Sequence, residues 1–189
     1  MDRNSECARR IASVIRKETD LARWSDARNL DPSWGLRSRL VSNYIASSSH
    51  LLDLGCGSSL IEKYLDISCK YLPADIILRN DRTVFCNLNE SIFPSQIHDV
   101  DTILMLGVLE YVFDFPLLFS KLATYKKKII FSYCDVDTSK LRSFQARAAF
   151  GWVNSYTCAE IENFILRANS VSLFSFEIDN LQRGYIAQF

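Results

Sequence analysis

Apolar residues recur along the chain in two alternating spacings, and these spacings predict its helices and strands. Residues 5–18 place Cys7, Ile11, Val14 and Ile15 on one helical stripe, which predicts a first helix. Further helices are predicted at 36–47, at 59–66, after residue 107 as far as Leu122, and at 158–169. Apolar runs predict strands at 51–55, 70–77, 83–88, 101–107, 127–134, 171–178 and 183–189.

Alternation of strands with helical stretches is typical of a parallel sheet that is covered by helices on both faces. The last two strands are separated only by residues 179–182, so we expect them to form a hairpin. The pattern predicts an α/β doubly wound fold, with a mostly parallel seven-stranded sheet and a C-terminal antiparallel hairpin. One region does not fit, because only residues 78–82 separate the second strand from the third. A parallel crossover usually needs about a dozen residues, so either a helix is missing or one strand is short.

Composition and charge narrow the class of protein. The 189-residue chain contains 22 Lys and Arg residues against 22 Asp and Glu residues, and this balance argues against a nucleic-acid partner. The N-terminal "MDRNSECARR" lacks the apolar core of a signal peptide, and no segment is apolar enough to cross a membrane. The 6 cysteines are scattered and accompanied by 2 histidines, so no metal site is expected. These features predict a cytoplasmic protein with reduced thiols and no membrane partner.

The stretch "DLGCGSS", residues 53–59, carries the most specific chemical signal. Gly55 and Gly57 follow a predicted strand and precede a predicted helix, where glycine allows positive φ and close approach of a ligand. The helix that is expected to begin near Ser58 offers free N–H groups to a polar or anionic ligand. A nicotinamide dinucleotide fingerprint requires a further glycine where Leu60 stands, and so this fingerprint fails.

The pattern Asp53-x-Gly55-x-Gly57 resembles motif I of the class I S-adenosylmethionine-dependent methyltransferases, with Ser59 in place of the usual third glycine. About twenty residues on, Asp75 ends the second predicted strand, where an acidic side chain can accept hydrogen bonds from both ribose hydroxyls. Asn87-Leu88 stands where the family often has an Asp and an apolar residue at the adenine. "DTILMLGVLEYVFD" resembles the family's fourth-strand motif, so that the likeness covers residues 48–135. A weaker likeness follows in "GWVNSYTCAEIENFI".

This resemblance implies a Rossmann-like methyltransferase fold. Residues 1–47 would then form an N-terminal helical cap segment, and residues 48–189 the cofactor-binding methyltransferase domain of one compact unit. The cofactor would be S-adenosyl-L-methionine, and the residues that would bind it are Asp53, Gly55, Cys56, Gly57, Asp75, Ile76, Asn87, Leu88, Leu106 and Gly107.

Candidate catalytic groups follow the fourth and fifth predicted strands. Glu110 is either a general base or a side chain that orients its loop. Tyr111 stands where relatives often carry a histidine, and a phenol with a pKa near 10 is a poor base, so it lines the pocket instead. Asp135 is either a base or acceptor-binding group, or a solvated loop carboxylate, and Tyr133 lies near the expected acceptor.

The N-terminal segment supplies the remaining candidates. In many relatives this segment folds over the cleft, where Trp24 and Trp34 would form an apolar lid. Arg37 either pairs with the methionyl carboxylate of the cofactor or is a surface charge, whereas Arg39 is expected at the surface. Trp152 is expected to pack under the last helix.

These observations predict a methyltransferase that acts on a small-molecule or sugar-like acceptor by in-line methyl transfer, as a monomer or homodimer. Methyl transfer requires no metal in principle, because holding the reactants at attack distance supplies much of the rate. A first alternative is an accessory or regulatory module that binds S-adenosylmethionine without catalysis. An NAD-dependent oxidoreductase is a second alternative, and aminopropyl transfer from a decarboxylated cofactor is a third.

Overall fold

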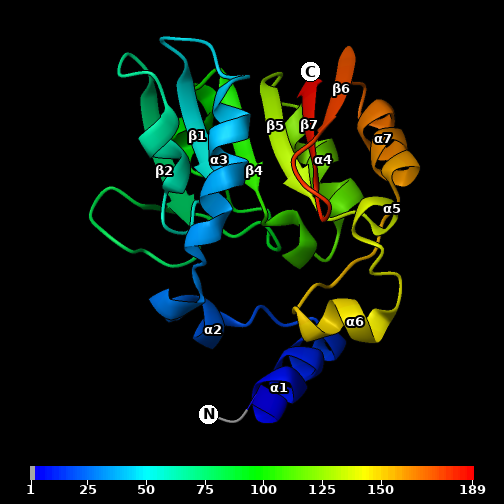
Figure 1. Cartoon of the computed structure of the whole chain (residues 1–189). Coiled ribbons are helices and arrows are strands. Elements are labelled where there is room, and N and C mark those ends of the chain that lie inside the picture. Colours follow the sequence, from blue (N-terminus) through cyan, green and yellow to red (C-terminus); the bar gives the residue numbers. More distant parts are fainter. Residues whose placement is uncertain (1–2) are drawn as a thin grey trace.

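The computed structural model describes residues 3–189, so the first two residues of the expected cap segment lie outside it (Figure 1). Its centre is a seven-stranded sheet of order β3-β2-β1-β4-β5-β7-β6. The strands are β1 (His50–Leu54), β2 (Lys70–Asp75), β3 (Val84–Phe85), β4 (Thr102–Leu106), β5 (Lys128–Tyr133), β6 (Ser172–Glu177) and β7 (Arg183–Gln188). β1 to β5 are parallel, whereas β7 pairs antiparallel with β5 and β6. The predicted seven-stranded sheet with its terminal hairpin is therefore confirmed.

Most of the helices are short. The α-helices are α1 (Arg3–Arg16), α2 (Leu21–Ser25), α3 (Gly35–Ser42), α4 (Phe115–Ala123), α5 (Val136–Ser139), α6 (Phe144–Ala149) and α7 (Cys158–Arg167). The 3₁₀ turns are η1 (Ala27–Asn29), η2 (Pro32–Trp34), η3 (Leu60–Tyr64), η4 (Ser95–His98) and η5 (Leu109–Tyr111). No helix in residues 3–189 combines the length and apolar character that a membrane span requires.

The predicted helices differ from the observed ones in type and in length, at places where capping and turn residues determine how a helix begins or ends. The helix predicted at 59–66 is the 3₁₀ turn η3, because Ser59 before it adopts a left-handed backbone with φ 55°. The helix predicted at 36–47 already ends at Ser42. After β4 the chain makes the short turn η5, and α4 then begins where Asp114 accepts a hydrogen bond from the Leu117 amide.

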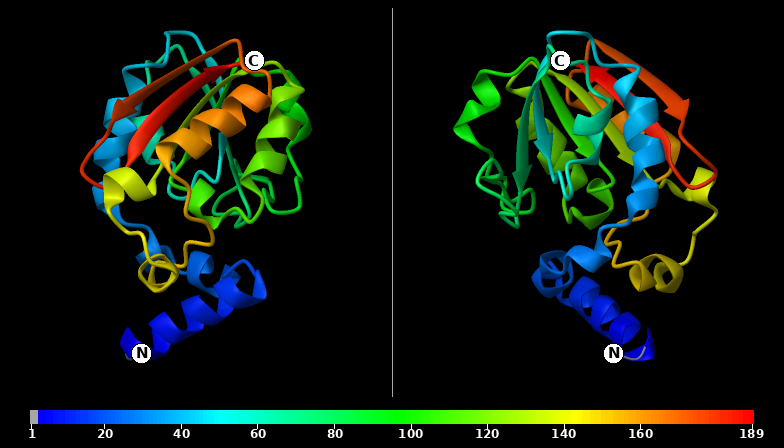
Figure 2. Two further views of the ribbon diagram at one scale, coloured as in Figure 1. Left: turned by 90° about the vertical axis from the view of Figure 1, so that its right-hand side faces the viewer. Right: turned by 60° about the vertical axis from the view of Figure 1, so that its left-hand side comes forward.

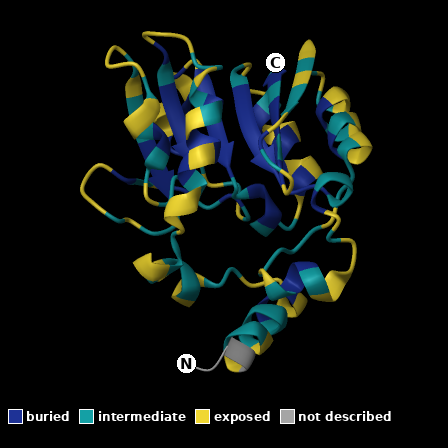
Figure 3. Cartoon of the chain, viewed as in Figure 1, coloured by how far each residue is buried: buried dark blue, intermediate teal, exposed yellow. Residues whose placement is uncertain are grey.

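The core lies on both faces of β1 and β4, whose side chains are almost all buried (Figure 3). One face packs against α4 and α7, through residues such as Phe119 and Ile161. The opposite face packs against α3 and η3, through Val41 and Ile61 (Figure 2). The parallel strands are thus covered on both sides, as a doubly wound arrangement requires.

The missing crossover has a simple explanation, since β3 is only two residues long and pairs with the end of β2 at Ala74 and Asp75. The connection is a loop whose turn is fixed by Asn80, which accepts hydrogen bonds from the amides of Arg82 and Thr83. Of the two alternatives that the sequence left open, a missing helix and a short strand, the structure shows both. The connection between β2 and β3 contains no helix, and Ile76 and Arg79 on it line the cavity described below.

A second layer lies beyond the carboxyl ends of the parallel strands, where α1, α2 and α6 are grouped below the sheet in Figure 1. α1 and α6 pack together, and Arg10 of α1 donates a hydrogen bond to the Ala149 carbonyl of α6 at 3.3 Å. This layer brings the beginning of the chain over the sheet edge at which parallel α/β folds bind ligands.

Candidate cofactor site

A cavity lies at the carboxyl ends of β1, β2 and β4 and encloses about 960 Å³ of empty space, including its open mouth. All the residues that the resemblance assigns to the cofactor line this cavity, namely Asp53, Gly55, Cys56, Gly57, Asp75, Ile76, Asn87, Leu88, Leu106 and Gly107. Residues from four separate segments of sequence are thereby brought to one place.

The glycine loop adopts the backbone conformations that its sequence suggests. Gly55 has φ +80°, and a Cβ at this position would lie 2.5 Å from the Val108 side chain. Gly57 also has positive φ, at +54°. Ser59 is left-handed as well, which explains why glycine is favoured at this position of the motif.

Asp75 holds the glycine loop in place. Its Oδ2 accepts a hydrogen bond from the Gly57 amide at 2.8 Å, and its Oδ1 accepts one from the Ile77 amide at 2.9 Å. The carboxylate is buried and lines the cavity. Its orientation is therefore fixed by backbone donors, while each oxygen retains a second lone pair for a ligand.

Asp53 is a buried carboxyl group with one unused oxygen. Its Oδ2 accepts a hydrogen bond from the Tyr71 hydroxyl at 2.6 Å, whereas its Oδ1 is buried without a partner. Burial raises the pKa of Asp53 to about 7, partly offset by the Tyr71 hydrogen bond. A cationic or hydrogen-bond-donating ligand group would satisfy Oδ1 and favour the ionised form.

Arg37 brings a buried cation to the opposite wall of the cavity. Its guanidinium lies against Gly107, since a Cβ there would be 2.2 Å from Nη1, and it lies 5.6 Å from the Trp34 ring centroid. Its hydrogen bond to the Gln182 side chain is long, at 3.4 Å. Among the described residues no carboxylate is within ion-pairing distance, and burial lowers the pKa of Arg37. Arg37 is thus suited to an anionic ligand group.

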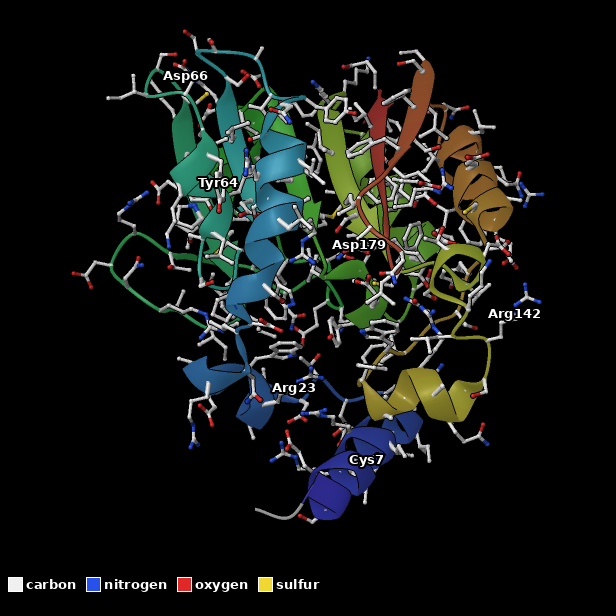
Figure 4. The ribbon with its side chains drawn as sticks, in the orientation of Figure 1. Cys7, Arg23, Tyr64, Asp66, Arg142 and Asp179 are labelled. Atoms are coloured by element: carbon white, nitrogen blue, oxygen red, sulfur yellow. The ribbon has the colours of Figure 1, made fainter. Side chains whose placement is uncertain are left out.

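The N-terminal segment covers the cavity with aromatic side chains. Trp24 packs edge-on against Tyr111, with ring centroids 4.8 Å apart, and both line the cavity together with Trp34. Arg79, on the loop after β2, donates a hydrogen bond to the Trp24 carbonyl at 2.7 Å. Arg23, on α2, donates to the Phe150 carbonyl directly after α6 at 2.6 Å (Figure 4). These contacts attach the N-terminal segment to the loop after β2 and to the end of α6.

Asn89 joins three segments around the cavity, and its role was missed by the sequence analysis. Its side-chain amide donates to the Thr19 hydroxyl and to the Tyr111 carbonyl, at 3.2 and 3.1 Å. Its carbonyl oxygen accepts from the Phe113 amide at 2.9 Å. The sequence contains only a weak signal for Asn89, namely its place directly after the predicted adenine-binding pair Asn87-Leu88.

Three predicted site residues lie outside the cavity lining. Glu110 is buried and accepts a hydrogen bond from the Cys134 amide at 2.7 Å. Asp135 is buried and caps α5 by accepting from the amides of Asp137 and Thr138. The roles predicted for Glu110 and Asp135 in catalysis stay predictions, and the structure gives both carboxylates backbone partners.

Tyr133 is the third of these residues. It is buried, and its hydroxyl accepts hydrogen bonds from Arg147 and from the Tyr156 amide, each at 3.1 Å, and donates to Asn154. Its predicted contact with substrate stays a prediction. Lining residues that the sequence analysis did not single out include Thr19, Leu30, Ser38, Arg79, Cys86, Asn89 and Val108.

Comparisons with known proteins complete this description. No protein-family model matches the sequence, and a search of curated proteins returns no match. Solved structures do match: a candidate O-methyltransferase from Nostoc punctiforme aligns over 98% of this chain and 68% of its own, with TM-score 0.67 and 12% identity. Human N-acetylserotonin methyltransferase in complex with SAM aligns over 97% of this chain and 66% of its own, with TM-score 0.62 and 12% identity. The plantazolicin methyltransferase BpumL, in complex with a monoazolic desmethylPZN analogue and SAH, aligns over 98% of this chain and 97% of its own, with TM-score 0.64 and 12% identity.

The fold is that of the class I S-adenosylmethionine-dependent methyltransferases. At 12% identity these likenesses establish the methyltransferase fold alone. The chain spans about two thirds of the length of the Nostoc and human proteins and nearly all of BpumL. Within this methyltransferase fold, the cavity occupies the switch point between β1 and β4, at which open α/β sheets bind their ligands.

Proposed function

We propose that this protein is an S-adenosylmethionine-dependent methyltransferase whose acceptor is a small molecule or a sugar-like compound. The observation that carries the proposal is the convergence of every predicted cofactor residue on one cavity at the carboxyl edge of the sheet. The human and BpumL structures, which contain SAM and SAH, have the same fold and support this choice of cofactor.

The residues present fit the two ends of this cofactor. Asp53 has a buried oxygen without a partner, which suits the cationic α-amino group, while the buried guanidinium of Arg37 suits the α-carboxylate. Asp75 retains lone pairs for the ribose hydroxyls. Asn87 and Leu88 would contact the adenine from the β3 side of the cavity.

Bound S-adenosylmethionine supplies an electrophilic methyl group on a sulfonium. The contribution of this chain is to hold the acceptor in line with that methyl group and to exclude water. Trp24, Trp34 and Tyr111 provide apolar surface for the acceptor and separate it from solvent. Aromatic walls of this kind favour a flat or small apolar body over a large polymer.

The described lining contains no carboxylate other than Asp53 and Asp75, and no histidine. With both carboxylates assigned to the cofactor, the acceptor nucleophile would reach the methyl group without a protein base. A neutral amine or an already ionised oxygen or sulfur meets this condition. The same observation also favours the second candidate, a module that binds the cofactor without catalysis.

Calorimetric titration of the full chain with S-adenosylmethionine, S-adenosylhomocysteine and NADH tests the cofactor. We expect binding of the two sulfur nucleotides and none of NADH, with at least tenfold weaker binding in Asp75→Asn. Asp66→Asn is the matched control, because Asp66 is exposed at the opposite end of the sheet (Figure 4). If neither sulfur nucleotide binds, the proposed function is wrong.

A second measurement separates the enzyme from the binding module. The protein is incubated with S-adenosylmethionine and pools of small amines, phenols, thiols and sugars, and release of S-adenosylhomocysteine is followed. Acceptor-dependent release identifies a methyltransferase. Binding without release from any pool supports the accessory module.

A further inference from the structure

A second cluster of chemically reactive side chains lies away from the cofactor cavity, where the end of β5 meets the start of α7. It consists of Asp135, Asp137 and Cys158, and none of the three lines the cavity. Within residues 3–189, this is the group of such side chains whose potential ligand atoms all lie within 4.8 Å of one another. α5 and α7 lie next to each other in Figure 1.

The backbone holds this cluster together independently of any ligand. The Cys158 amide donates to Asp137 Oδ2 at 3.0 Å, and the Val136 amide donates to the Tyr156 carbonyl at 3.1 Å. Asp135 Oδ1 accepts from the amides of Asp137 and Thr138, at 3.0 and 2.7 Å. Local hydrogen bonds therefore define the positions of both carboxylates and of the Cys158 backbone.

One oxygen in the cluster has no partner. Asp135 is 0% exposed, and its Oδ2 accepts no hydrogen bond, although its other oxygen accepts two. The Cys158 thiol, a weak hydrogen-bond donor, lies beside Asp135 and beside the buried hydroxyl of Tyr185 on the neighbouring strand β7. A buried carboxylate oxygen without a strong donor is destabilising, so an additional cationic partner would be stabilising here.

The donor set indicates the type of cation. Two carboxylate oxygens and a thiolate sulfur combine hard and soft ligands, and sulfur favours zinc over magnesium or calcium. Zinc bonds of about 2.0–2.3 Å place tetrahedral ligand atoms about 3.5 Å apart, so side-chain rotations that close the 4.8 Å span by about 1 Å suffice. Asp137 and Cys158 are partly exposed, which gives the ion a path of entry and leaves room for a water as fourth ligand.

We propose that Asp135, Asp137 and Cys158 form a zinc-type divalent metal site that joins the end of β5 to the start of α7. On binding, the metal–sulfur bond forms as the Cys158 S–H bond breaks, and the proton is released to solvent. No electron is transferred. Because the site is separate from the cofactor cavity, this proposal does not depend on the proposed methyltransferase activity.

The test uses the full chain after removal of metals with a chelator. Co²⁺ is titrated first, because cobalt bound to a thiolate gives a ligand-to-metal charge-transfer band in the near ultraviolet. We expect one equivalent to produce this band and Zn²⁺ to abolish it. At Zn²⁺ concentrations about 100 times Kd, the midpoint of thermal unfolding should rise by about 5–10 °C.

Two variants locate the ligands. Cys158→Ser should abolish the band, and Asp135→Asn should weaken binding at least 100-fold, comparable to or beyond the effect of losing an outer-shell partner. The Asn side chain keeps an oxygen that can cap α5, so this variant can retain the fold. Cys7→Ser is the matched control, since Cys7 is a partly buried thiol on α1 (Figure 4).

Near-ultraviolet circular dichroism verifies that each variant is folded before metal is added. The proposal is overturned if folded wild-type protein gives no charge-transfer band. It is equally overturned if the band persists in Cys158→Ser, which would mean adventitious binding at another cysteine. Where Cys158→Ser fails to fold, Cys158→Ala and Asp137→Asn provide the same comparison.

Discussion

The guanidinium of Arg37, on α3, lies directly against the backbone of Gly107 at the end of β4. A Cβ at residue 107 would approach Nη1 to 2.2 Å, and the residue has φ +69°. Gly107 is therefore restricted twice, by its left-handed conformation and by its neighbour. This contact fixes the position of the Arg37 guanidinium in the cavity wall.

Gly107→Ala should lower the free energy of unfolding by more than the approximately 1–2 kcal/mol that the left-handed backbone alone costs. The excess comes from displacement of Arg37. In the Arg37→Ala background the same substitution should cost only the backbone contribution. Urea unfolding of the four proteins of this double-mutant cycle measures both values. Equal costs in the two backgrounds would contradict the role of the contact.

Arg37→Met should weaken binding of S-adenosylhomocysteine by about 10–100-fold, because a charge-assisted hydrogen bond contributes about 1.5–3 kcal/mol. Binding of adenosine, which lacks the methionyl carboxylate, should not change. Arg39→Met is the matched control, since Arg39 lies on the same helix but is exposed. Calorimetry with both ligands distinguishes loss of the carboxylate contact from general disruption, which would weaken adenosine as well.

The stability of the protein should depend on the ionisation of Asp53. Its pKa is raised to about 7 in the folded state, whereas an unfolded Asp has a pKa near 3.9. Between these values the folded state holds more protons, so the contribution of Asp53 to stability falls as pH rises, by up to about 1.4 kcal/mol per unit. Above about pH 8 this contribution is constant.

Urea unfolding at pH 5, 6, 7 and 8, compared with Asp53→Asn, isolates this effect from the other carboxylates. The stability of the wild type relative to the variant should decrease steadily up to pH 7. A difference that does not change with pH would show that Asp53 titrates normally.

Ligand binding should alter the fluorescence of two of the 3 tryptophans. Trp24 and Trp34 line the cavity, whereas Trp152 stacks on Phe150 outside it, at a centroid distance of 4.9 Å. Addition of S-adenosylhomocysteine should change the emission of Trp152→Phe as it does that of the wild type. The response should be lost in Trp24→Phe/Trp34→Phe. A response carried by Trp152 would place the ligand elsewhere.

Tyr133→Phe should destabilise the protein by about 2 kcal/mol, because Arg147, Asn154 and the Tyr156 amide lose a shared partner in a buried place. Affinity for S-adenosylhomocysteine should stay within twofold of wild type, since Tyr133 does not line the cavity. Urea unfolding and calorimetry give the two quantities. Unchanged stability combined with lost acceptor-dependent turnover would instead support the predicted substrate contact.

The sheet and the glycine loop could be predicted because their signals are local. The central strands β4 and β5 contain apolar runs at residues 103–106 and 129–131, and the motif from Asp53 to Gly57 joins a strand to a turn whose positive φ angles require glycine. The capping box of α7 is a local feature too, as Thr157 lies three residues before Glu160. In these places neighbouring residues determine the conformation.

The rest depends on contacts between distant segments, which one sequence does not reveal. Asn89 meets Thr19 across 70 positions, and Arg79 meets Trp24 across 55. Glu110 and Asp135 follow the expected strands, yet their side chains turn toward backbone amides and away from the cavity. Which way such a side chain turns is decided by the nearest unsatisfied donor, and that donor comes from the tertiary fold.

The two hydrogen bonds that Asp75 accepts from the Gly57 and Ile77 amides have a thermodynamic consequence for ligand recognition. If ribose binds here as proposed, a carboxylate already held by amides would lose little rotational entropy, whereas immobilising a free side chain costs about 0.5–1.5 kcal/mol. One of these bonds joins the carboxylate to the Gly57 amide, so that a change in the glycine loop would also move the proposed ribose-binding group. The entropic cost of ordering the Asp75 carboxylate is thus met during folding, before any ligand binds.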